Sequence, residues 1–276
     1  MVGDRREPRE DIGELHELLR RRSLADGLRE LADLFRQPRH RGRHAALAIT
    51  FAIRLAHPRL EPLEVHNRPI FANRHEAGRQ LAATLDDLAG DPAVVVLGLP
   101  RGGVPVAREV AAALGAPLDV FVVRKLGAPS QPELALGAIA SGGAIALNDD
   151  IVQHLGIDAT QLQAIIDAQR AEVDARERSY RGDRPRLSLA GRIVVLVDDG
   201  LATGATMRAA VAAARQHRAA SVIAAAPVAA PEAVALLQPS VDGVAVVSTP
   251  SDFIAVGRWY RDFQQVSDDE VRRCLD

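Results

Sequence analysis

The segment from Arg192 to Val211, RIVVLVDDGLATGATMRAAV, constrains the fold of this chain more than any other stretch. Residues 193–197 form a run of β-branched and aliphatic side chains, which predicts a buried strand. A loop with two glycines follows, and the alanine-rich sequence after it predicts a helix that reaches about residue 217. Strand, loop and helix in this order are the repeating unit of α/β folds, in which helices connect parallel strands.

The same alternation continues from about residue 70 to the C-terminus. Further strands are predicted at 93–100, 118–123, 221–229 and 243–247, with two short strands around Gly142 and Gly143. Further helices are predicted at 74–89, 104–115 and 158–180, with a short one from Pro231. Because the strands are continuously apolar, we predict an α/β fold with a doubly wound, mainly parallel sheet that is covered on both faces.

Residues 1–65 have a different pattern. Apolar residues recur at helical spacing between Ile12 and Phe35, and the sequence RQPRHRGRH then interrupts them. We therefore predict an N-terminal helical extension or linker over 1–65, followed by one domain over 66–276. The basic cluster could contact phosphate or RNA, but no recognition-helix pattern or interleaved aromatic residues accompany it, which favours a solvated linker.

Composition excludes several classes of protein. The net charge of -2 gives no general attraction to nucleic acid, so a nucleic-acid partner is not favoured. The first ten residues are too charged for a signal peptide, and the longest apolar runs are too short or are broken by prolines, so we expect a cytoplasmic protein without a membrane segment. Cys274 is the single cysteine, which excludes a disulfide within the chain and a cysteine-rich metal site.

The loop after the 193–197 strand has the residues of a ligand site. Gly200 and Gly204 allow the backbone to approach a ligand, and the start of the following helix offers free N–H groups to a phosphate. Asp198 and Asp199 precede the loop and could bind sugar hydroxyls or a divalent cation. We therefore expect a phosphorylated sugar, with unequal roles for the two aspartates because neighbouring strand residues point to opposite faces. An acidic turn that merely caps the helix is the structural alternative.

Two other phosphate-binding motifs are absent from the sequence. Neither GxxxxGK[ST] nor GxGxxG occurs, which argues against a P-loop NTPase and a dinucleotide-binding fingerprint. Instead, VVLVDDGLATGATM closely resembles the phosphoribosyl-pyrophosphate motif of type I phosphoribosyltransferases. The resemblance extends over about residues 70–276. GLPRGGVPVA and VGRWYRDFQQV are similar to segments of a poorly characterised bacterial subgroup of that superfamily.

The resemblance implies a set of ligand-binding residues. It assigns phosphoribosyl pyrophosphate to the acidic pair and the loop after it, which comprise Asp198, Asp199, Gly200, Ala202, Thr203, Gly204, Ala205 and Thr206. It assigns the pyrophosphate group to a second loop, which contains Pro100, Gly102 and Gly103 and binds through backbone amides, with the side chain of Arg101 adding a charge. Mg²⁺ is the implied cofactor, held at Asp198 and Asp199 directly or through ligand or water. For the second loop, an ordinary glycine turn is the alternative.

The resemblance also implies a mobile loop that closes over the site, in the segment RKLGAPSQPELALGAI. Lys125 stands at its base as a candidate catalytic cation for pyrophosphate, and Glu133 is a candidate general acid or base. Lys125 is the only lysine among 34 lysine and arginine residues, so a chance survivor of an arginine-rich coding bias is the alternative. For Glu133 the alternative is a solvated loop residue.

The implied activity is transfer of the phosphoribosyl group to a nitrogenous, nucleobase-like acceptor with release of pyrophosphate. Enzymes of this superfamily that act on 6-oxopurines usually carry an aspartate where this chain has Ala202, which puts guanine and hypoxanthine in doubt. Trp259 and Tyr260 are candidates for stacking on the acceptor, with the core as the alternative. A non-catalytic regulatory protein that binds phosphoribosyl pyrophosphate is the rival function, and a homodimer is one assembly left open.

Overall fold

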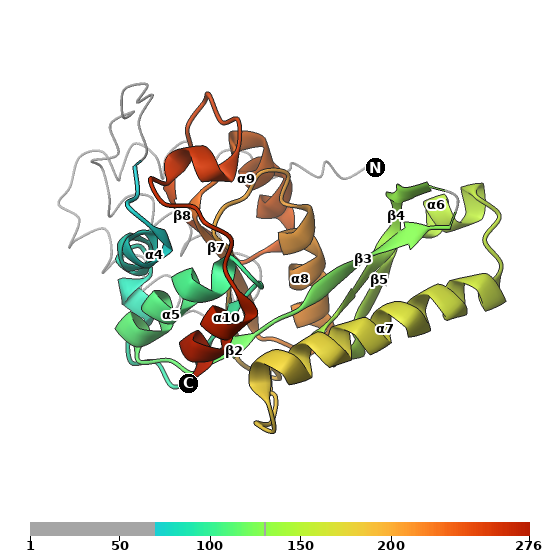
Figure 1. Cartoon of the computed structure of the whole chain (residues 1–276), viewed down its shortest axis with the longest axis horizontal. Coiled ribbons are helices and arrows are strands. Elements are labelled where there is room, and N and C mark those ends of the chain that lie inside the picture. The colour runs from blue at the N-terminus through green and yellow to red at the C-terminus, as the bar shows by residue number, and fades with distance from the viewer. Residues whose placement is uncertain (1–69, 130) are drawn as a thin grey trace, which may run out of the picture. The chain divides into compact units, whose positions relative to one another are not determined.

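The computed structural model describes residues 70–129 and 131–276, apart from the side chains of residues 132 and 133. In this part, five strands form one sheet in the order β2-β1-β6-β7-β8. They are β1 (Val94–Gly98), β2 (Leu118–Val120), β6 (Ile193–Val197), β7 (Ser221–Val228) and β8 (Gly243–Ser248). All neighbouring strands run parallel, which confirms the predicted α/β fold with a mainly parallel sheet (Figure 1). The extension predicted over 1–65 lies outside the described residues.

Helices cover both faces of this sheet because alternate residues of each strand point to opposite sides. Val95 and Leu97 of β1 pack in a core with α8 (Ala205–Gln216) and α9 (Pro231–Leu237). Val94 and Val96 pack in a second core with α4 (Arg74–Ala82) and α5 (Gly103–Leu114). The continuous apolar runs of the strands are therefore explained by burial on both faces.

A second, antiparallel sheet extends from the edge strand β2. It contains β3 (Val123–Ala128), β4 (Gln131–Ala140) and β5 (Ile145–Leu147), and it is followed by α6 (Asp149–His154) and α7 (Ala159–Arg181). Leu126 and Leu136 pack with Ile166 and Val173 of α7 in a third core, which continues into residues of α5, β2 and the C-terminal segment. We call residues 123–181 the arm, and Figure 1 shows it reaching away from the parallel sheet.

The arm includes the segment that the sequence predicted as a mobile loop. The structure shows a β-hairpin there, in which Lys125 pairs with Ala138 and Leu126 with Gly137. The two strands predicted around Gly142 and Gly143 are present as β4 and β5, with a short 3-10 turn (Ser141–Gly143) between them. The strand predicted over 118–123 is divided, because β2 ends at Val120 and the chain then enters the arm.

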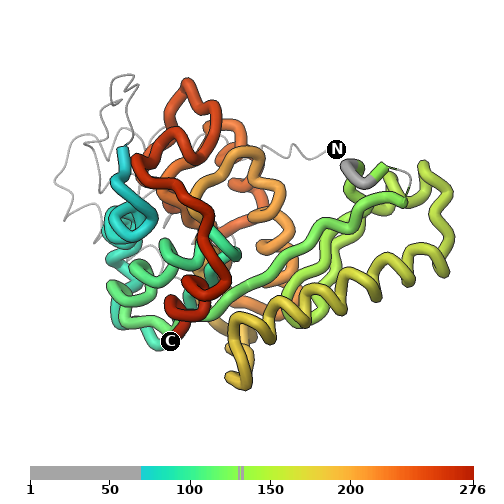
Figure 2. The backbone as a smooth tube through the Cα atoms, in the orientation of Figure 1, coloured from blue at the N-terminus to red at the C-terminus, as the bar shows by residue number. Residues whose placement is uncertain are grey.

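Two short connections and the C-terminal helix complete the domain. The helix predicted over 74–89 ends at Ala82, and a 3-10 turn (Asp86–Leu88) follows it. Asn73 caps α4 as expected, since its Oδ1 accepts a hydrogen bond from the N–H of Glu76 at 3.0 Å. Two more 3-10 turns (Gln238–Ser240 and Val256–Trp259) lead to α10 (Asp268–Leu275), which packs against α5 and α7. Figure 2 shows the C-terminal segment passing beside α5 to reach α10.

Buried ion pairs fix the end of α7 to β2. Arg181 Nε lies 2.9 Å from Asp119 Oδ1, and Arg181 Nη2 lies 3.2 Å from Glu177 Oε1. Arg186 Nε donates to Glu177 Oε2 at 3.0 Å. Burial works to raise the pKa of the Glu177 carboxyl, but hydrogen bonds from Arg186 and Ser141 and the charges of both arginines outweigh it, so this pKa lies below its ordinary value. The network therefore anchors the arm.

None of the helices in residues 70–129 and 131–276 combines the length and the apolar character that crossing a membrane requires.

We predict that Glu177→Gln lowers the free energy of unfolding by about 3 kcal/mol at neutral pH, because Arg181 and Arg186 then lose the buried carboxylate that they share, and Asp119 alone remains as a buried countercharge. Since the pKa of Glu177 is lowered by folding, its charge stabilises the protein above the ordinary carboxyl pKa, and this contribution is lost as pH falls through the folded-state pKa. The difference between wild type and variant should therefore shrink between pH 7 and about pH 3.

Denaturant titrations at several pH values measure this difference. Glu172→Gln is the matched control, because Glu172 lies on the same helix in surface pairs with Arg124 and Arg176 and should cost less than about 1 kcal/mol. A Glu177→Gln effect that is small, or that is constant with pH, would contradict the stabilising role of this network.

Candidate active site

The acidic pair lies at the carboxyl end of β6. Asp198 continues the sheet, since its N–H donates to the carbonyl of Ala225 on β7 at 3.1 Å. Its carboxylate then turns back and accepts a hydrogen bond from the N–H of Asp199 at 2.9 Å. Both residues are half-buried. The pair therefore stands at the edge where open parallel sheets bind ligands.

The loop that follows β1 touches this pair. Leu99 donates its N–H to the carbonyl of Val197 at 2.8 Å, and Gly103 donates to the carbonyl of Leu99 at 3.0 Å. A Cβ atom at Gly103 would lie 2.4 Å from the carbonyl oxygen of Val197, and one at Gly102 would lie 2.0 Å from Oδ2 of Asp199. Glycine is thus required at both positions, because the loop and the acidic pair are in direct contact.

The loop after the acidic pair leads into α8. The N–H of Leu201 donates to the carbonyl of Val228, the last residue of β7, at 2.9 Å. The carbonyl of Leu201 accepts a hydrogen bond from the N–H of Ala230 at 2.8 Å. Gly204 is the N-cap residue of α8 and has a φ of 70°, a conformation that favours glycine. Around it, Ala202, Thr203, Ala205 and Thr206 are exposed. This backbone holds small and hydroxyl-bearing side chains at the edge of the sheet.

The start of α8 has the properties of an anion site. Among the described residues, no side chain caps this helix, so N–H groups of its first turn remain available to a ligand. Thr203 Oγ1 lies 3.4 Å from the N–H of Ala205, a long contact that leaves the hydroxyl accessible. The helix dipole adds a positive potential at the same point. A phosphate group is the ligand that fits these features.

Arg74 compensates part of the negative charge. Its Nε lies 2.8 Å from Oδ2 of Asp199, and both side chains are largely shielded from solvent. Burial raises the pKa of the Asp198 carboxyl, and the charge of Asp199 beside it raises the pKa further. Burial also raises the pKa of Asp199, but the Arg74 guanidinium opposes this effect. The two acids therefore differ in their surroundings, and the unequal roles expected from the sequence stay a prediction.

The aromatic residues near the C-terminus belong to the core. Trp259 and Tyr260 are 3% and 4% exposed and pack with Phe71, so neither stacks on an exposed ligand surface as one of the two sequence hypotheses supposed. The Tyr260 hydroxyl donates to the carbonyl of Asp199 at 2.6 Å. Burial raises the pKa of Tyr260, so this hydroxyl stays protonated and remains a donor. Tyr260 thus supports the acidic pair from behind.

The three candidate catalytic residues lie on different elements. Arg101 is in the loop after β1, partly exposed, with Nη1 3.7 Å from Asp268 Oδ1. Lys125 lies on β3 of the arm, where its side chain is exposed. The backbone of Glu133 belongs to β4, and its side chain lies outside the described part of the chain. The structure therefore places Arg101 in the loop that contacts the acidic pair through Gly102, with its side chain toward Asp268, and places Lys125 and Glu133 on the hairpin.

Arg74 and the residues that hold it were missed by the sequence reasoning. The only local signal was its position after Asn73 at the start of a predicted helix, which carries no information about a partner 125 residues away. The sequence VGRWYRDFQQV was noted as a family-like segment, but its contact with the acidic pair through Tyr260 depends on the folded chain.

The residues at this edge are compatible with Mg²⁺ only if a ligand also contributes. Within residues 70–129 and 131–276 there is no group of three or more histidine, cysteine, aspartate or glutamate residues that could hold a metal ion alone. Mg²⁺ commonly uses one or two carboxylates together with substrate phosphate oxygens. Among the described residues, Asp199 forms an ion pair with Arg74, whereas the Asp198 carboxylate accepts a hydrogen bond from the backbone. Asp198 is therefore the better of the two metal ligands.

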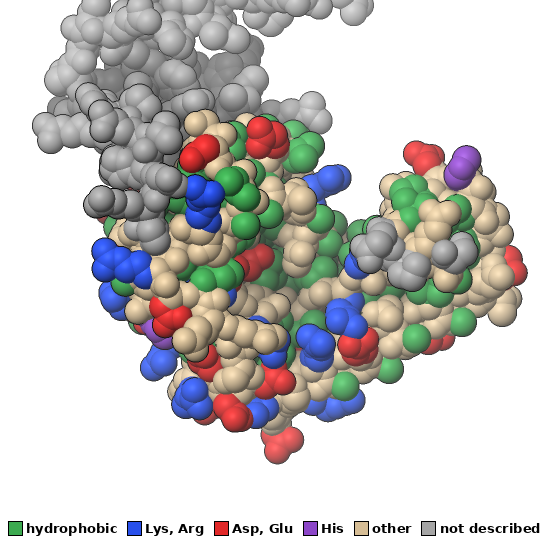
Figure 3. All heavy atoms as spheres, turned by 45° about the horizontal axis from the view of Figure 1, so that its top comes forward, with side chains coloured by type: hydrophobic (Ala, Val, Ile, Leu, Met, Phe, Trp, Pro, Cys, Tyr) green, Lys and Arg blue, Asp and Glu red, His purple; other side chains and the backbone are tan. Residues whose placement is uncertain are grey.

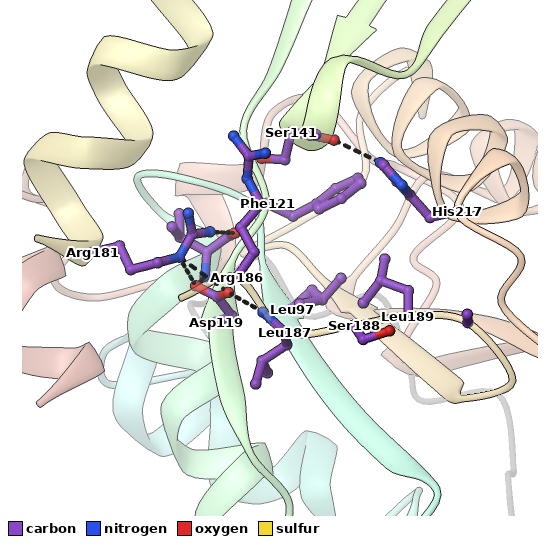
Figure 4. Close-up of a pocket in the computed structure, with 13 residues that line it drawn as sticks. Leu97, Asp119, Phe121, Ser141, Arg181, Arg186, Leu187, Ser188, Leu189 and His217 are labelled. Atoms are coloured by element: carbon purple, nitrogen blue, oxygen red, sulfur yellow. Dashed lines mark hydrogen bonds and ion pairs between the residues drawn. The ribbon is translucent and has the colours of Figure 1, made fainter. Parts of the chain in front are cut away.

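A cavity of about 260 Å³ lies elsewhere, at the base of the arm (Figure 4). Its walls include Asp119, Phe121, Arg181 and His217, and none of the loop residues 99–103 or 198–206 contributes to it. Figure 3 shows a separate hollow in the surface between the parallel-sheet layer and the arm. The cavity at the base of the arm is therefore separate from the candidate ligand edge.

Comparisons with known proteins match the part of the chain that contains these loops. The family model for the phosphoribosyl transferase domain matches residues 70–256. Two proteins of Mycobacterium tuberculosis, Rv0571c and MT0597, are provisionally named phosphoribosyl transferases, and each is 53% identical over 207 residues. The match covers 75% of this chain and 46% of theirs, so the chain spans less than half the length of these relatives.

A solved structure agrees with this assignment at the level of the fold. The crystal structure of TT1426 from Thermus thermophilus is 47% identical and superposes with a TM-score of 0.67. The superposition covers 74% of this chain and 97% of TT1426. The described domain thus corresponds to nearly the whole of that protein.

We predict that Gly102→Ala lowers the free energy of unfolding by about 1–3 kcal/mol, because the new methyl group would overlap the Asp199 carboxylate that Arg74 holds in place. Gly243→Ala is the matched control, since a Cβ there would make only ordinary contacts with Ile223 at 3.6 Å. Denaturant unfolding of both variants measures the difference. Equal stabilities would show that the loop and the acidic pair are not packed as described.

Proposed function

Because the chain belongs to the phosphoribosyl transferase domain family, we propose that it is a Mg²⁺-dependent phosphoribosyltransferase. It would transfer the phosphoribosyl group of phosphoribosyl pyrophosphate to a nitrogenous, nucleobase-like acceptor and release pyrophosphate. This chain spans only part of the length of the relatives, so the proposal concerns the described domain and not the whole of those proteins.

One observation carries this proposal. The glycine loop after β1 and the acidic pair after β6 are in van der Waals contact at one edge of the sheet, with Gly102 directly against Asp199. The uncapped start of α8 lies in the loop that continues from the same pair. A ligand that binds there meets the N–H groups of the first turn of α8 at one end, the Gly102 N–H and the dipole end of α5 at the other, and carboxylates between them. A ribose with a phosphate and a diphosphate on opposite sides has the matching chemistry.

Each group of the ligand has proposed partners. The 5-phosphate would bind the loop formed by Gly200, Ala202, Thr203, Gly204, Ala205 and Thr206 at the positive end of α8. The diphosphate would bind along the loop of Pro100, Gly102 and Gly103, with the N–H of Gly102 as a donor and Arg101 supplying charge. The ribose hydroxyls would donate to Asp198 and Asp199.

The reaction then requires positioning and charge stabilisation more than covalent catalysis. A nitrogen atom of the acceptor bonds to C1 of the ribose while the bond from C1 to the diphosphate oxygen breaks, and the bonding pair leaves with the diphosphate. A proton lost from the acceptor nitrogen passes to Glu133 or to water. Bound Mg²⁺ would neutralise charge on the departing diphosphate, and Arg101, Lys125 and the loop N–H groups would stabilise the same charge.

The acceptor is the least constrained part of the proposal. Ala202 stands where related 6-oxopurine enzymes usually carry an aspartate, and it is exposed at the ligand edge. Its methyl group offers no hydrogen bond or charge to a purine. We therefore propose an acceptor other than guanine or hypoxanthine.

The deciding measurement is pyrophosphate release from phosphoribosyl pyrophosphate and Mg²⁺ with a panel of nitrogenous bases. We expect release with at least one base, and Asp198→Asn should reduce it at least about tenfold by removing a charged ribose acceptor. Asp183→Asn is the matched control, because Asp183 is exposed in the connection after α7. Tight ligand binding without release on any base would instead support the regulatory binding protein, and absence of binding would reject both functions.

Lys125 gives an independent test. As the only lysine, it can be acetylated with the α-amino group as the sole other amine, and intact mass reports the extent. If its ammonium contacts the diphosphate, ligand with Mg²⁺ should slow acetylation, and acetylation should reduce turnover by at least about tenfold. Reductive methylation keeps the charge and is the control. Full activity of both Lys125→Ala and Lys125→Arg would remove the lysine from the mechanism.

A further inference from the structure

Arg74 makes several directed contacts at the edge of the sheet. Its Nε bonds to Oδ2 of Asp199, and its Nη1 donates to the carbonyl of Gln264, both at 2.8 Å. Its guanidinium carbon lies 3.9 Å from the centre of the Phe263 ring, within the range of a cation–π contact. The side chain is 11% exposed, so its position is determined by these contacts and not by solvent.

Asp199, the partner of Arg74, is in contact with three other segments of the chain and with its neighbour Asp198. Its carboxylate meets Arg74 at the start of α4 and lies against Gly102 of the loop after β1. Its carbonyl accepts the Tyr260 hydroxyl from the C-terminal segment, and its N–H donates to Asp198. A shift of this carboxylate would therefore be transmitted to the loop that is proposed to bind diphosphate.

Asp198 has a different environment. The ion pair at this edge joins Arg74 to Asp199, and the carboxylate of Asp198 accepts a hydrogen bond from the adjacent backbone. Two adjacent uncompensated carboxylates would repel a ligand that carries phosphate groups. With Arg74 in place, the net charge of the three side chains is close to that of one carboxylate.

We propose that Arg74 is a positioning residue for phosphoribosyl pyrophosphate. It neutralises Asp199 and holds it against the loop after β1, so that Asp198 is the carboxylate that meets the ribose hydroxyls. This inference rests on the proposed function, since it concerns the same ligand. It assigns Asp199 an internal role and divides the acidic pair into one supporting residue and one ligand-facing residue.

The test measures affinity for phosphoribosyl pyrophosphate with Mg²⁺ by calorimetry on the full chain. Arg74→Gln should weaken binding at least tenfold. Arg79→Gln is the matched control, because it removes the same charge from the same helix at an exposed position paired with Glu109, and it should change affinity less than twofold. Circular dichroism checks that each variant is folded.

Two further variants separate positioning from a general structural role. Because Arg74 is proposed to act through Asp199, Arg74→Gln should weaken binding less than twofold when it is added to Asp199→Asn. Arg74→Lys keeps the positive charge, so it should bind at least threefold more tightly than Arg74→Gln. It also serves as the milder variant if Arg74→Gln does not fold.

The outcomes are distinct. If wild type and Arg79→Gln bind the ligand and Arg74→Gln binds equally well, the inference about Arg74 is wrong while the proposed function stands. Equal losses from Arg74→Gln in the wild-type and Asp199→Asn backgrounds would also overturn it, as would a Lys variant no better than Gln. If wild type does not bind phosphoribosyl pyrophosphate, the proposed function fails and the inference fails with it.

Discussion

The in-register parallel pairing of β1 and β6 is the constraint on which the rest of the site depends. Gly98 is opposite Val197, so the two strands end at the same level and their loops leave the sheet side by side. The hydrogen bond from Leu99 to Val197 extends this pairing by one residue into the first loop. A side chain at Gly103 would separate the two strand ends, because its Cβ would lie 2.4 Å from the Val197 carbonyl. Proximity of the glycine loop to the acidic pair is therefore a direct consequence of strand register.

The same register places two helix starts at this edge. α5 begins at Gly103 and α8 at Ala205, and among the described residues neither has a side-chain cap. At α5 the N–H groups of Gly103 and Val104 already donate to the carbonyls of Leu99 and Arg101, so this helix start contributes its positive dipole end. The start of α8 offers N–H groups as well, and the aspartates between the two helices offer acceptors. The alternation of positive, negative and positive regions matches a ligand with anionic groups at both ends and hydroxyls in the middle. Burial makes the two adjacent carboxylates costly, and the Arg74 ion pair offsets part of that cost.

The features that the sequence predicted correctly are those encoded by neighbouring residues. The apolar run 193–197 and its glycine loop predicted a strand and the helix after it, and alternation of such units predicted the parallel sheet. The Arg74–Asp199 pair joins residues 125 positions apart, and no local pattern encodes it. In the arm, the sequence predicted the two strands around Gly142 and Gly143 and the long helix after them, but it missed the pairing of β3 with β4, because this glycine- and alanine-rich segment has weak strand propensity and is held as a hairpin by packing on α7. Contacts between side chains that are distant in sequence depend on tertiary packing, so local sequence patterns do not predict them.

The hairpin changes how Lys125 can take part in the proposed chemistry. On a loop, a lysine could approach the diphosphate by local backbone rearrangement. In this structure its strand is paired with β4, and Leu126 beside it packs in the core formed with α7. The base of the arm is fixed by bonds between Ser141 and Val122 at 2.8 Å and by the ion pairs of Arg181. Lys125 can therefore approach the loop after β1 through extension of its own side chain or through movement of the arm as a unit.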